Sequence, residues 1–459
     1  MGISNRLVIS EPTTQVANYC ADKLTLANPE YMKKKMMNKW VGNTPLELEL
    51  YEVRDGKLIL PYGCLRNIIP YFTKQDTIVP LFQTAPKVRM GEPIPLYDYQ
   101  EEAVSEMIRQ IYGILQSKAG SGKTQMGLAI AQRLKCKTLW LTHTIDLLNQ
   151  SYERAVKYIP EELLGTITAG KVHIGESITF ATIQTMALLD LTEYRNIWDT
   201  IIVDECHRVC GTPTAVTQFS KVLNSLAARH KYGLSATVHR ADGLIQATYA
   251  LLGDVRYRVP DEACADKVMP VGIKLVQTNV KYSDECFNSD GTIYFIGMIN
   301  YLVEHPERNK IINDIIKSNK DEYILVLSDR IKHLDILYNN LPKELQKYAA
   351  IIKGDLQTKT AKKHREDCIK QMREGTLHIL FATYKLAKEG LDIPRLNRLI
   401  LATPQKDYAV ITQAIGRIAR VFDGKNEAIC FDVLDDIDYL RRMFGKRKTS
   451  YKKADCYFV

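Results

Sequence analysis

The sequence lacks the features that would place it among membrane, secreted or disordered proteins. No apolar run approaches the roughly 18 residues that a membrane span requires. Residues 1–10 contain neither the apolar stretch nor the small-residue cleavage site of a secretory signal. The 10 cysteines form no disulfide framework, and hydrophobic and charged residues make up an ordinary 46% and 25%. We therefore expect a soluble cytoplasmic protein with reduced thiols.

Excess positive charge is confined to the two ends of the chain. The net charge is +9, of which residues 1–90 contribute +4 and residues 441–459 contribute +6, so the middle is nearly neutral. Basic ends fit contact with a phosphate backbone, although solubilising tails carry the same charge. The cations of interest are Lys33, Lys34, Lys35 and Lys39 beside Trp40, and Arg441, Arg442, Lys446, Arg447, Lys448, Lys452 and Lys453 around Tyr451.

The first ninety residues predict a small, separate module with mixed α and β structure. Apolar and polar residues alternate over 46–50, and the apolar pattern resumes over 58–60 after Asp55-Gly56. Asp-Gly between such runs predicts a hairpin, because both residues tolerate positive φ. Residues 28–40 predict a short helix.

The rest of the chain alternates strands with longer helical stretches, which indicates parallel sheets with crossover helices. We expect one lobe over residues 91–258, a connector over 259–300, a second lobe over 301–440, and a basic tail over 441–459. The predicted strands are 111–116, 138–141, 177–180, 200–203, 232–234, 323–327, 378–382, 398–401 and 428–431.

A glycine-rich loop follows the first predicted strand of lobe one and opens a helix. It reads Ser117-Lys-Ala-Gly-Ser-Gly-Lys-Thr124. Such a loop lets backbone N–H groups close around a phosphate at a helix N-terminus. Lys123 would reach the β/γ-phosphates, and the Thr124 hydroxyl would ligate Mg²⁺. The other loop residues that we expect to bind nucleotide are Gly120, Ser121 and Gly122.

An apolar strand further on ends in two carboxylates, Asp204 and Glu205. A carboxylate at a strand tip beside a phosphate loop can hold Mg²⁺, and we assign this role to Asp204. Glu205 can polarise an attacking water. A zinc site at Cys206, His207 and Cys210 is disfavoured, because no fourth ligand lies at usable spacing.

These two motifs, in this order, resemble superfamily 2 helicases, and other segments of lobe one extend the resemblance. It implies that Gln100 reads the adenine base, and that Thr142 contacts a nucleic-acid strand. Thr182, Gln184 and Thr185 belong to a second strand-contacting segment. The resemblance further implies that one motif couples hydrolysis to lobe movement, at Ser235, Ala236 and Thr237.

Lobe two carries the remaining motifs of the family. By resemblance, Arg330 and Thr383 contact the nucleic-acid strand, and Asp392 contacts the ribose. The segment from Gln413 resembles the arginine-finger helix, with Arg417 and Arg420 directed at the γ-phosphate. These two arginines are three residues apart, which predicts that they share one helical face.

The resemblance spans about residues 94–432 and is strongest to the UvsW/XPB-like branch, judged by the segment 233–243, and to phage branch-migration helicases. It implies two tandem RecA-like lobes with a small α+β N-terminal domain. It also implies an ATP- and Mg²⁺-dependent DNA helicase acting on single-stranded and branched DNA, without structural zinc and in the host cytoplasm if phage-encoded. We expect a monomer. The alternatives are an RNA helicase, a double-strand translocase without unwinding, and a nucleotide-gated binding module without turnover.

Overall fold

The structure is a computed structural model, and its described parts fall into two compact units. Residues 1–118 with 122–263 form the first unit, and residues 119–121 with 264–459 form the second. No helix in the described ranges is both long and apolar enough to cross a membrane. The described residues are 1–73, 75–82, 86–118, 120–168, 170–209, 213–236, 244–260, 262–263, 268–353, 358–388, 391 and 393–459.

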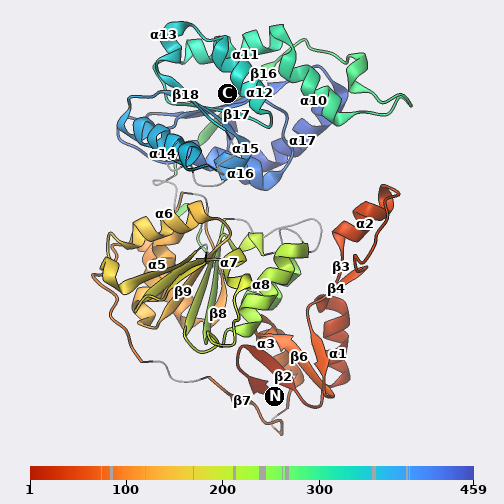
Figure 1. Cartoon of the computed structure of the whole chain (residues 1–459), viewed down its shortest axis with the longest axis vertical. Helices are drawn as coiled ribbons and strands as arrows, with labels where there is room; N and C mark the ends of the chain where they lie inside the picture. Colours follow the sequence, from red (N-terminus) through yellow and green to blue (C-terminus); the bar gives the residue numbers. More distant parts are fainter. Residues whose placement is uncertain are drawn as a thin grey trace. The chain divides into compact units, whose positions relative to one another are not determined.

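Lobe one is built on an eight-stranded sheet with the order β11-β10-β12-β9-β13-β14-β8-β15 (Figure 1). All neighbouring strands are parallel except β10 and β11. Its central strands are buried at every position, as expected for a parallel sheet covered on both faces. The strands are β8 (Tyr112–Gln116), β9 (Thr138–Thr142), β10 (Leu164–Thr168), β11 (Lys171–His173), β12 (Ile178–Thr182), β13 (Thr200–Asp204), β14 (His230–Ser235) and β15 (Val255–Arg258).

Two groups of helices cover this sheet, so the predicted α/β class is confirmed. One group comprises α4 (Asp98–Arg109), α5 (Lys123–Leu134) and α6 (Ile145–Ala155). The other comprises α7 (Ile183–Leu188), α8 (Pro213–Ser225) and α9 (Ile245–Leu252).

The N-terminal module contains a five-stranded sheet with the order β5-β6-β2-β1-β7, and a separate pair, β3-β4. The hairpin at Asp55-Gly56 is confirmed, and both residues have positive φ. Its first strand, however, is β5, because residues 47–49 pair with β3 instead. The elements are β1 (Gly2–Ile3), β2 (Arg6–Ile9), α1 (Thr14–Tyr19), β3 (Thr25–Ala27), α2 (Pro29–Met36), β4 (Glu47–Glu49), β5 (Glu52–Arg54), β6 (Lys57–Pro61), α3 (Leu65–Ile68) and β7 (Val79–Pro80).

The expectation of a separate module is wrong, because the module shares a hydrophobic core with lobe one. Tyr112 and Ala250 of lobe one belong to the same buried cluster as the module's apolar residues. The hydroxyl of Tyr62 donates to the carbonyl of Arg229 at 3.2 Å. Lys231, whose pKa is lowered to about 7 by burial, donates to the carbonyl of Asn5 at 3.3 Å. The module and lobe one are therefore expected to unfold together.

Replacing Gly63 by Ala is expected to disrupt this shared core. A Cβ at Gly63 would lie 2.5 Å from the backbone nitrogen of Gly253 and from the carbonyl oxygen of Tyr249. Because backbone cannot rotate away, we expect a loss of about 1–3 kcal/mol, the usual cost of overpacking. Calorimetry measures this loss as a lower midpoint temperature for the unfolding of the first unit. Gly445→Ala is the control, since its Cβ would meet nothing within 4 Å, and an equal shift in both variants would contradict the shared core.

Lobe two has a seven-stranded, fully parallel sheet with the order β18-β19-β17-β20-β21-β16-β22. The expected connector over 259–300 is corrected here, because it contains β16 and most of α10. β16 has no alternating pattern and was therefore not predicted; it becomes a strand by pairing with β21. The strands are β16 (Val271–Gln277), β17 (Ile324–Ser328), β18 (Ala349–Ile352), β19 (Ile379–Thr383), β20 (Arg398–Leu401), β21 (Ala428–Leu434) and β22 (Tyr457–Phe458).

The C-terminal segment is not a tail, contrary to expectation. It forms helix α17 and strand β22, which pairs with β16. Arg447 and Tyr451 are buried and bond the Asp432 carboxylate at 2.8 and 2.6 Å, so neither is available to nucleic acid. The helices of lobe two are α10 (Phe295–Glu304), α11 (Pro306–Ser318), α12 (Ile331–Asn339), α13 (Lys343–Gln346), α14 (Lys359–Glu374), α15 (Tyr384–Lys388), α16 (Tyr408–Ile418) and α17 (Asp438–Lys453).

Candidate functional site

The glycine-rich loop lies where expected, between the end of β8 and the start of α5. Gly120 and Gly122 have φ of +91° and +83°, which glycine adopts without strain. Gly122 is the N-cap of α5, so the free N–H groups of the first turn lie beside it. A Cβ at Gly122 would lie 2.4 Å from Nε2 of Gln100. The loop is thus a cradle that a side chain would fill, and the predicted base-reading amide lies against it.

Lys123 and the two carboxylates gather beside this loop. The Lys123 ammonium lies 4.0 Å from Oε1 of Glu205 and donates to the carbonyl of Lys118 at 3.4 Å. Asp204, the last residue of β13, accepts from Ser151 at 3.5 Å and from the Glu205 N–H at 3.0 Å. An ammonium, two carboxylates and a helix N-terminus form a donor set that fits a Mg²⁺-nucleotide.

Glu205 is held in an unusual backbone conformation. Its φ is +50°, in the left-handed region that few non-glycine residues adopt. The carboxylate lies 3.2 Å from Nδ1 of His207, and the same nitrogen lies 3.0 Å from the Ser235 hydroxyl. His207 therefore links the carboxylate pair to the predicted coupling segment. From the sequence, the only role considered for His207 was that of a metal ligand. Its position two residues after Glu205 was the signal that could have indicated a contact with this carboxylate.

The two adjacent carboxylates differ in acidity. Burial and the Glu205 charge raise the pKa of Asp204 to about 7. Burial would also raise the pKa of Glu205, but Lys123 and His207 outweigh it and lower that pKa to about 2. Glu205 is therefore ionised at neutral pH, while Asp204 is the position whose negative charge a divalent cation would stabilise.

Two strand ends of lobe one bring the predicted strand-contacting residues together. Thr142 and Thr182 are Cα partners at the carboxyl ends of neighbouring strands β9 and β12. Thr182 caps α7, and its hydroxyl lies 2.9 Å from that of Thr185. The amide of Gln184 lies 3.3 Å from Nδ1 of His143, which joins the two segments. Thr142 is fully buried and donates to the carbonyl of Thr144 at 3.0 Å. The groups that this edge presents are therefore the partly exposed Gln184 amide and Thr185 hydroxyl, which are of the kind that bind phosphate oxygens.

The equivalent edge of lobe two has the same character. Ser328 and Thr383 are Cα partners at the carboxyl ends of β17 and β19. The Thr383 hydroxyl is buried and has no hydrogen-bond partner among the described residues. Arg330 is the N-cap of α12 and donates to Asn300 at 3.3 Å. A buried hydroxyl of this kind is suited to a ligand atom.

The two predicted finger arginines do not share a helical face, contrary to expectation. Helix α16 ends at Ile418, and Arg420 forms an isolated β-bridge with Val268. The buried Lys425 explains this end, because its ammonium binds the carbonyls of Ile418 and Arg420 at 2.5 and 2.7 Å. Arg417 donates from Nε to the carbonyl of Ala387 at 2.9 Å.

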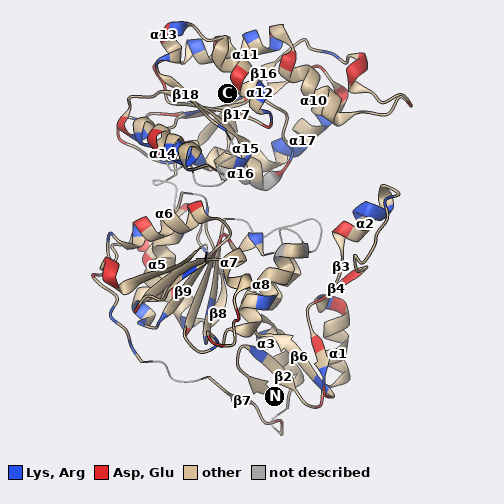
Figure 2. Cartoon of the chain, in the orientation of Figure 1, with Lys and Arg blue, Asp and Glu red and all other residues tan. Residues whose placement is uncertain are grey.

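The remaining residues named from the sequence are not part of the contacts described above. Thr237, Asp392 and Cys210 lie outside the described residues. Within those residues, no group of three or more His, Cys, Asp or Glu side chains could hold a metal ion. Gln413 lies in α16, where its buried Oε1 has no hydrogen-bond partner in the described chain. The cluster Lys33, Lys34 and Lys35 lies on α2, which appears as a basic band (Figure 2).

Two family models match the chain and together span more than half of it. The first, described as the res subunit of type III restriction enzymes, matches residues 93–240, and the second, the conserved C-terminal helicase domain, matches residues 307–422. They cover the loop, the carboxylate pair and the finger segment.

Proteins named as helicases or translocases are similar to this chain. A protein of Acanthamoeba polyphaga mimivirus, named as the ATP-dependent RNA helicase L396, is 26% identical over 74% of this chain and 64% of its own. Helicase D10 of Escherichia phage T5 is 26% identical over 94% of this chain and 89% of its own. The DNA 3′–5′ translocase XPB2 of Sulfurisphaera tokodaii is 24% identical over 80% of this chain and 88% of its own.

A solved structure shares the fold of this chain. The structure of S. cerevisiae Dbp5 bound to RNA and ADP BeF3 matches with a TM-score of 0.56 at 18% identity, over 79% of this chain and 89% of that chain. The two family models and the similar helicases confirm the family expected from the motifs. The chain belongs to the superfamily 2 helicases.

Proposed function

We propose that this helicase acts on DNA and remodels branched DNA such as forks and four-way junctions. The observation that carries the proposal is the docking of a lysine-bearing module onto lobe one through a shared core. To bind one strand, a helicase needs only the polar groups at the carboxyl ends of the strands in its two lobes. A rigidly attached basic module supplies a second contact, which a plain tailed duplex would not require.

The proposed nucleotide site is supported in the first unit by Lys123 and the carboxylate pair, and its lobe-two residues are assigned by resemblance to the family. Lys123 would hold the β- and γ-phosphates, while Thr124 and Asp204 would hold Mg²⁺. Gln100, Asp392 and Gln413 would contact the nucleoside and its phosphates, together with Gly120, Ser121 and Gly122 of the loop. Glu205 would orient and deprotonate the attacking water. Arg417 and Arg420 would stabilise charge on the γ-phosphate.

Strand contacts would come from both lobes. Thr142, Thr182, Gln184 and Thr185 would bind phosphates in lobe one, and Arg330 and Thr383 would do so in lobe two. Because these contacts address the backbone, binding should be largely independent of sequence. His207 would relay the state of Glu205 to Ser235, Ala236 and Thr237.

The test is unwinding on a panel of blunt duplex, tailed duplex, fork and four-way junction, with matched RNA substrates. Forks and junctions should be processed several-fold better than tailed duplex, with little activity on RNA. The comparison uses the full chain, because removing residues 1–90 would expose the core around Tyr112 and Ala250. Equal rates on fork and tailed duplex would contradict the branch preference.

Two other functions are favoured by names among the relatives. The mimivirus relative is named as an RNA helicase, and the archaeal relative is named as a DNA 3′–5′ translocase. The panel separates them: preferential unwinding of RNA indicates the first, and DNA-stimulated hydrolysis without strand separation indicates the second.

A further inference from the structure

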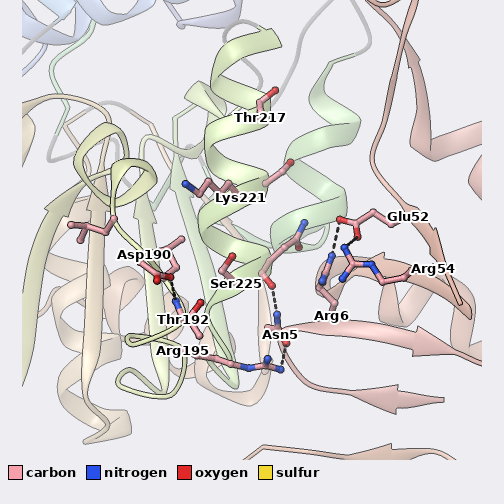
Figure 3. A pocket seen from close by; sticks show the side chains of 14 residues that line it. Asn5, Arg6, Glu52, Arg54, Asp190, Thr192, Arg195, Thr217, Lys221 and Ser225 are labelled. Carbon is pink, nitrogen blue, oxygen red and sulfur yellow. Dashed lines mark hydrogen bonds and ion pairs between the residues drawn. The ribbon is translucent and has the colours of Figure 1, made fainter.

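Two cavities adjoin along helix α8, between lobe one and the N-terminal module. The first has a volume of about 640 Å³ and lies between α8 and residues of the β1–β2 turn and β5 (Figure 3). The second, about 530 Å³, lies between α8 and the segment that follows α2. Thr217 lines both. At 1.5 Å per residue, the stretch from Thr214 to Ser225 is about 16 Å long. We name this continuous surface the α8 groove.

Positive charge in the groove is only partly neutralised. Arg6 and Arg54 share one carboxylate, Glu52, at 2.8 and 3.9 Å. Arg195 instead donates to the side-chain oxygen of Asn5 at 3.1 Å, as Figure 3 shows. It has no carboxylate within ion-pair distance in the described chain.

Lys221 is the second such cation. It donates to the carbonyl of Ala187 at 2.6 Å and has no ion pair among the described residues. The remaining acid of the cavity, Asp190, accepts from the Thr192 N–H at 3.0 Å, and Lys221 contributes to lowering its pKa. Arg195 and Lys221 are exposed, so both can reach an anion in the groove.

The other end of the groove carries an exposed aromatic ring. Trp40 lines the second cavity with 87% of its surface exposed. A Cβ at Gly42 would lie 3.0 Å from the indole, so the ring is supported on one face by this residue. An indole supported on one side and open on the other is suited to stacking on a nucleobase.

We propose that the α8 groove holds a single DNA strand, with a base stacked on Trp40 and backbone phosphates at Arg195 and Lys221. This inference rests on the proposed function and deepens it, because it gives the displaced strand of a fork its own site. At the 3.4 Å spacing of a stacked strand, about 16 Å accommodates at most roughly five phosphates. A single strand fits better than a duplex, whose bases are already stacked on one another.

Tryptophan fluorescence reports on this site directly. The chain has three tryptophans, and Trp140 and Trp198 are 0% and 2% exposed, so Trp40 alone meets solvent. Adding a fork whose displaced arm is single-stranded should quench the exposed emission. Trp40→Ala should abolish this change and weaken binding of the arm about tenfold, the usual scale for one lost stacking contact. Absence of quenching in a protein that shows DNA-stimulated hydrolysis would overturn the proposal.

Charge removal tests the phosphate contacts. The double variant Arg195→Gln, Lys221→Gln should lower the salt dependence of arm binding by about 1.4 in log–log slope, because each single-strand phosphate contact contributes about 0.7. The matched control removes two exposed lysines of lobe one outside the groove, Lys157→Gln and Lys171→Gln. An unchanged slope in the groove variant, or an equal loss in the control, would overturn the assignment.

The same variants separate the two proposals. If hydrolysis by the unaltered protein is not stimulated by DNA, the proposed function fails. If DNA stimulates hydrolysis normally but a fork and a tailed duplex quench Trp40 equally, the chain is a DNA-dependent motor whose α8 groove does not hold the displaced strand.

Discussion

Replacing Glu205 by Gln is expected to leave ATP binding intact and to slow hydrolysis by about 10²–10⁴-fold, the usual contribution of a general base. The amide keeps the shape of the side chain but cannot accept the proton of the attacking water. Its neighbour Lys123 lies 4.0 Å away, and the amide removes the negative charge opposite that ammonium. Binding of a fluorescent nucleotide and phosphate release with DNA present measure the two effects.

Two further variants make the result specific. Lys123→Ala should instead lose nucleotide binding, because it removes the cation that would hold the phosphates. Glu193→Gln removes an exposed carboxylate of the same lobe and should leave both measurements unchanged. Near-normal turnover in a folded Glu205→Gln protein would show that this carboxylate is not the base.

Arg420→Ala is expected to lower kcat by about 10³–10⁵-fold while ATP affinity changes little, as for an arginine finger that acts mainly in the transition state. The substitution should spare the fold, because Lys425 and Val268 hold Arg420 through backbone atoms. Single-turnover kinetics with a separate measurement of nucleotide affinity distinguishes the two effects.

The control for this variant is Lys347→Ala, which removes an exposed cation from the same lobe. Its kinetics should match those of the unaltered protein. If Arg420→Ala also retains full kcat, then the Arg420 side chain is not the finger, and Arg417 becomes the candidate.

Much of each lobe followed from local sequence patterns. The buried strands β9, β13, β17 and β19 read as short apolar runs bounded by polar residues, because a parallel sheet buries both faces of each strand. The glycine loop could also be predicted from the sequence. Gly122 occupies a backbone conformation that its sequence position, between a strand and a helix, already required.

Longer-range features did not follow from such patterns. Residues 46–50 alternate as a hairpin strand should, yet 47–49 pair with β3 because another segment supplies the partner. The cations at the C-terminus predicted a solvated tail. In the structure, however, Arg447 and its neighbour Tyr451 are buried and form hydrogen bonds with the Asp432 carboxylate. Burial of a charge depends on a distant partner that composition does not reveal.

The sequence by itself determined the family, the α/β class and the residues around the phosphate loop, because these depend on short segments with fixed spacing. Only the tertiary structure decided that Arg420 lies beyond α16, that His207 joins Glu205 to Ser235, and that the N-terminal module is part of lobe one. Each of these depends on contacts between segments far apart in the chain. Such contacts form when apolar surface is buried and polar groups find partners, and no local pattern specifies which segments will meet.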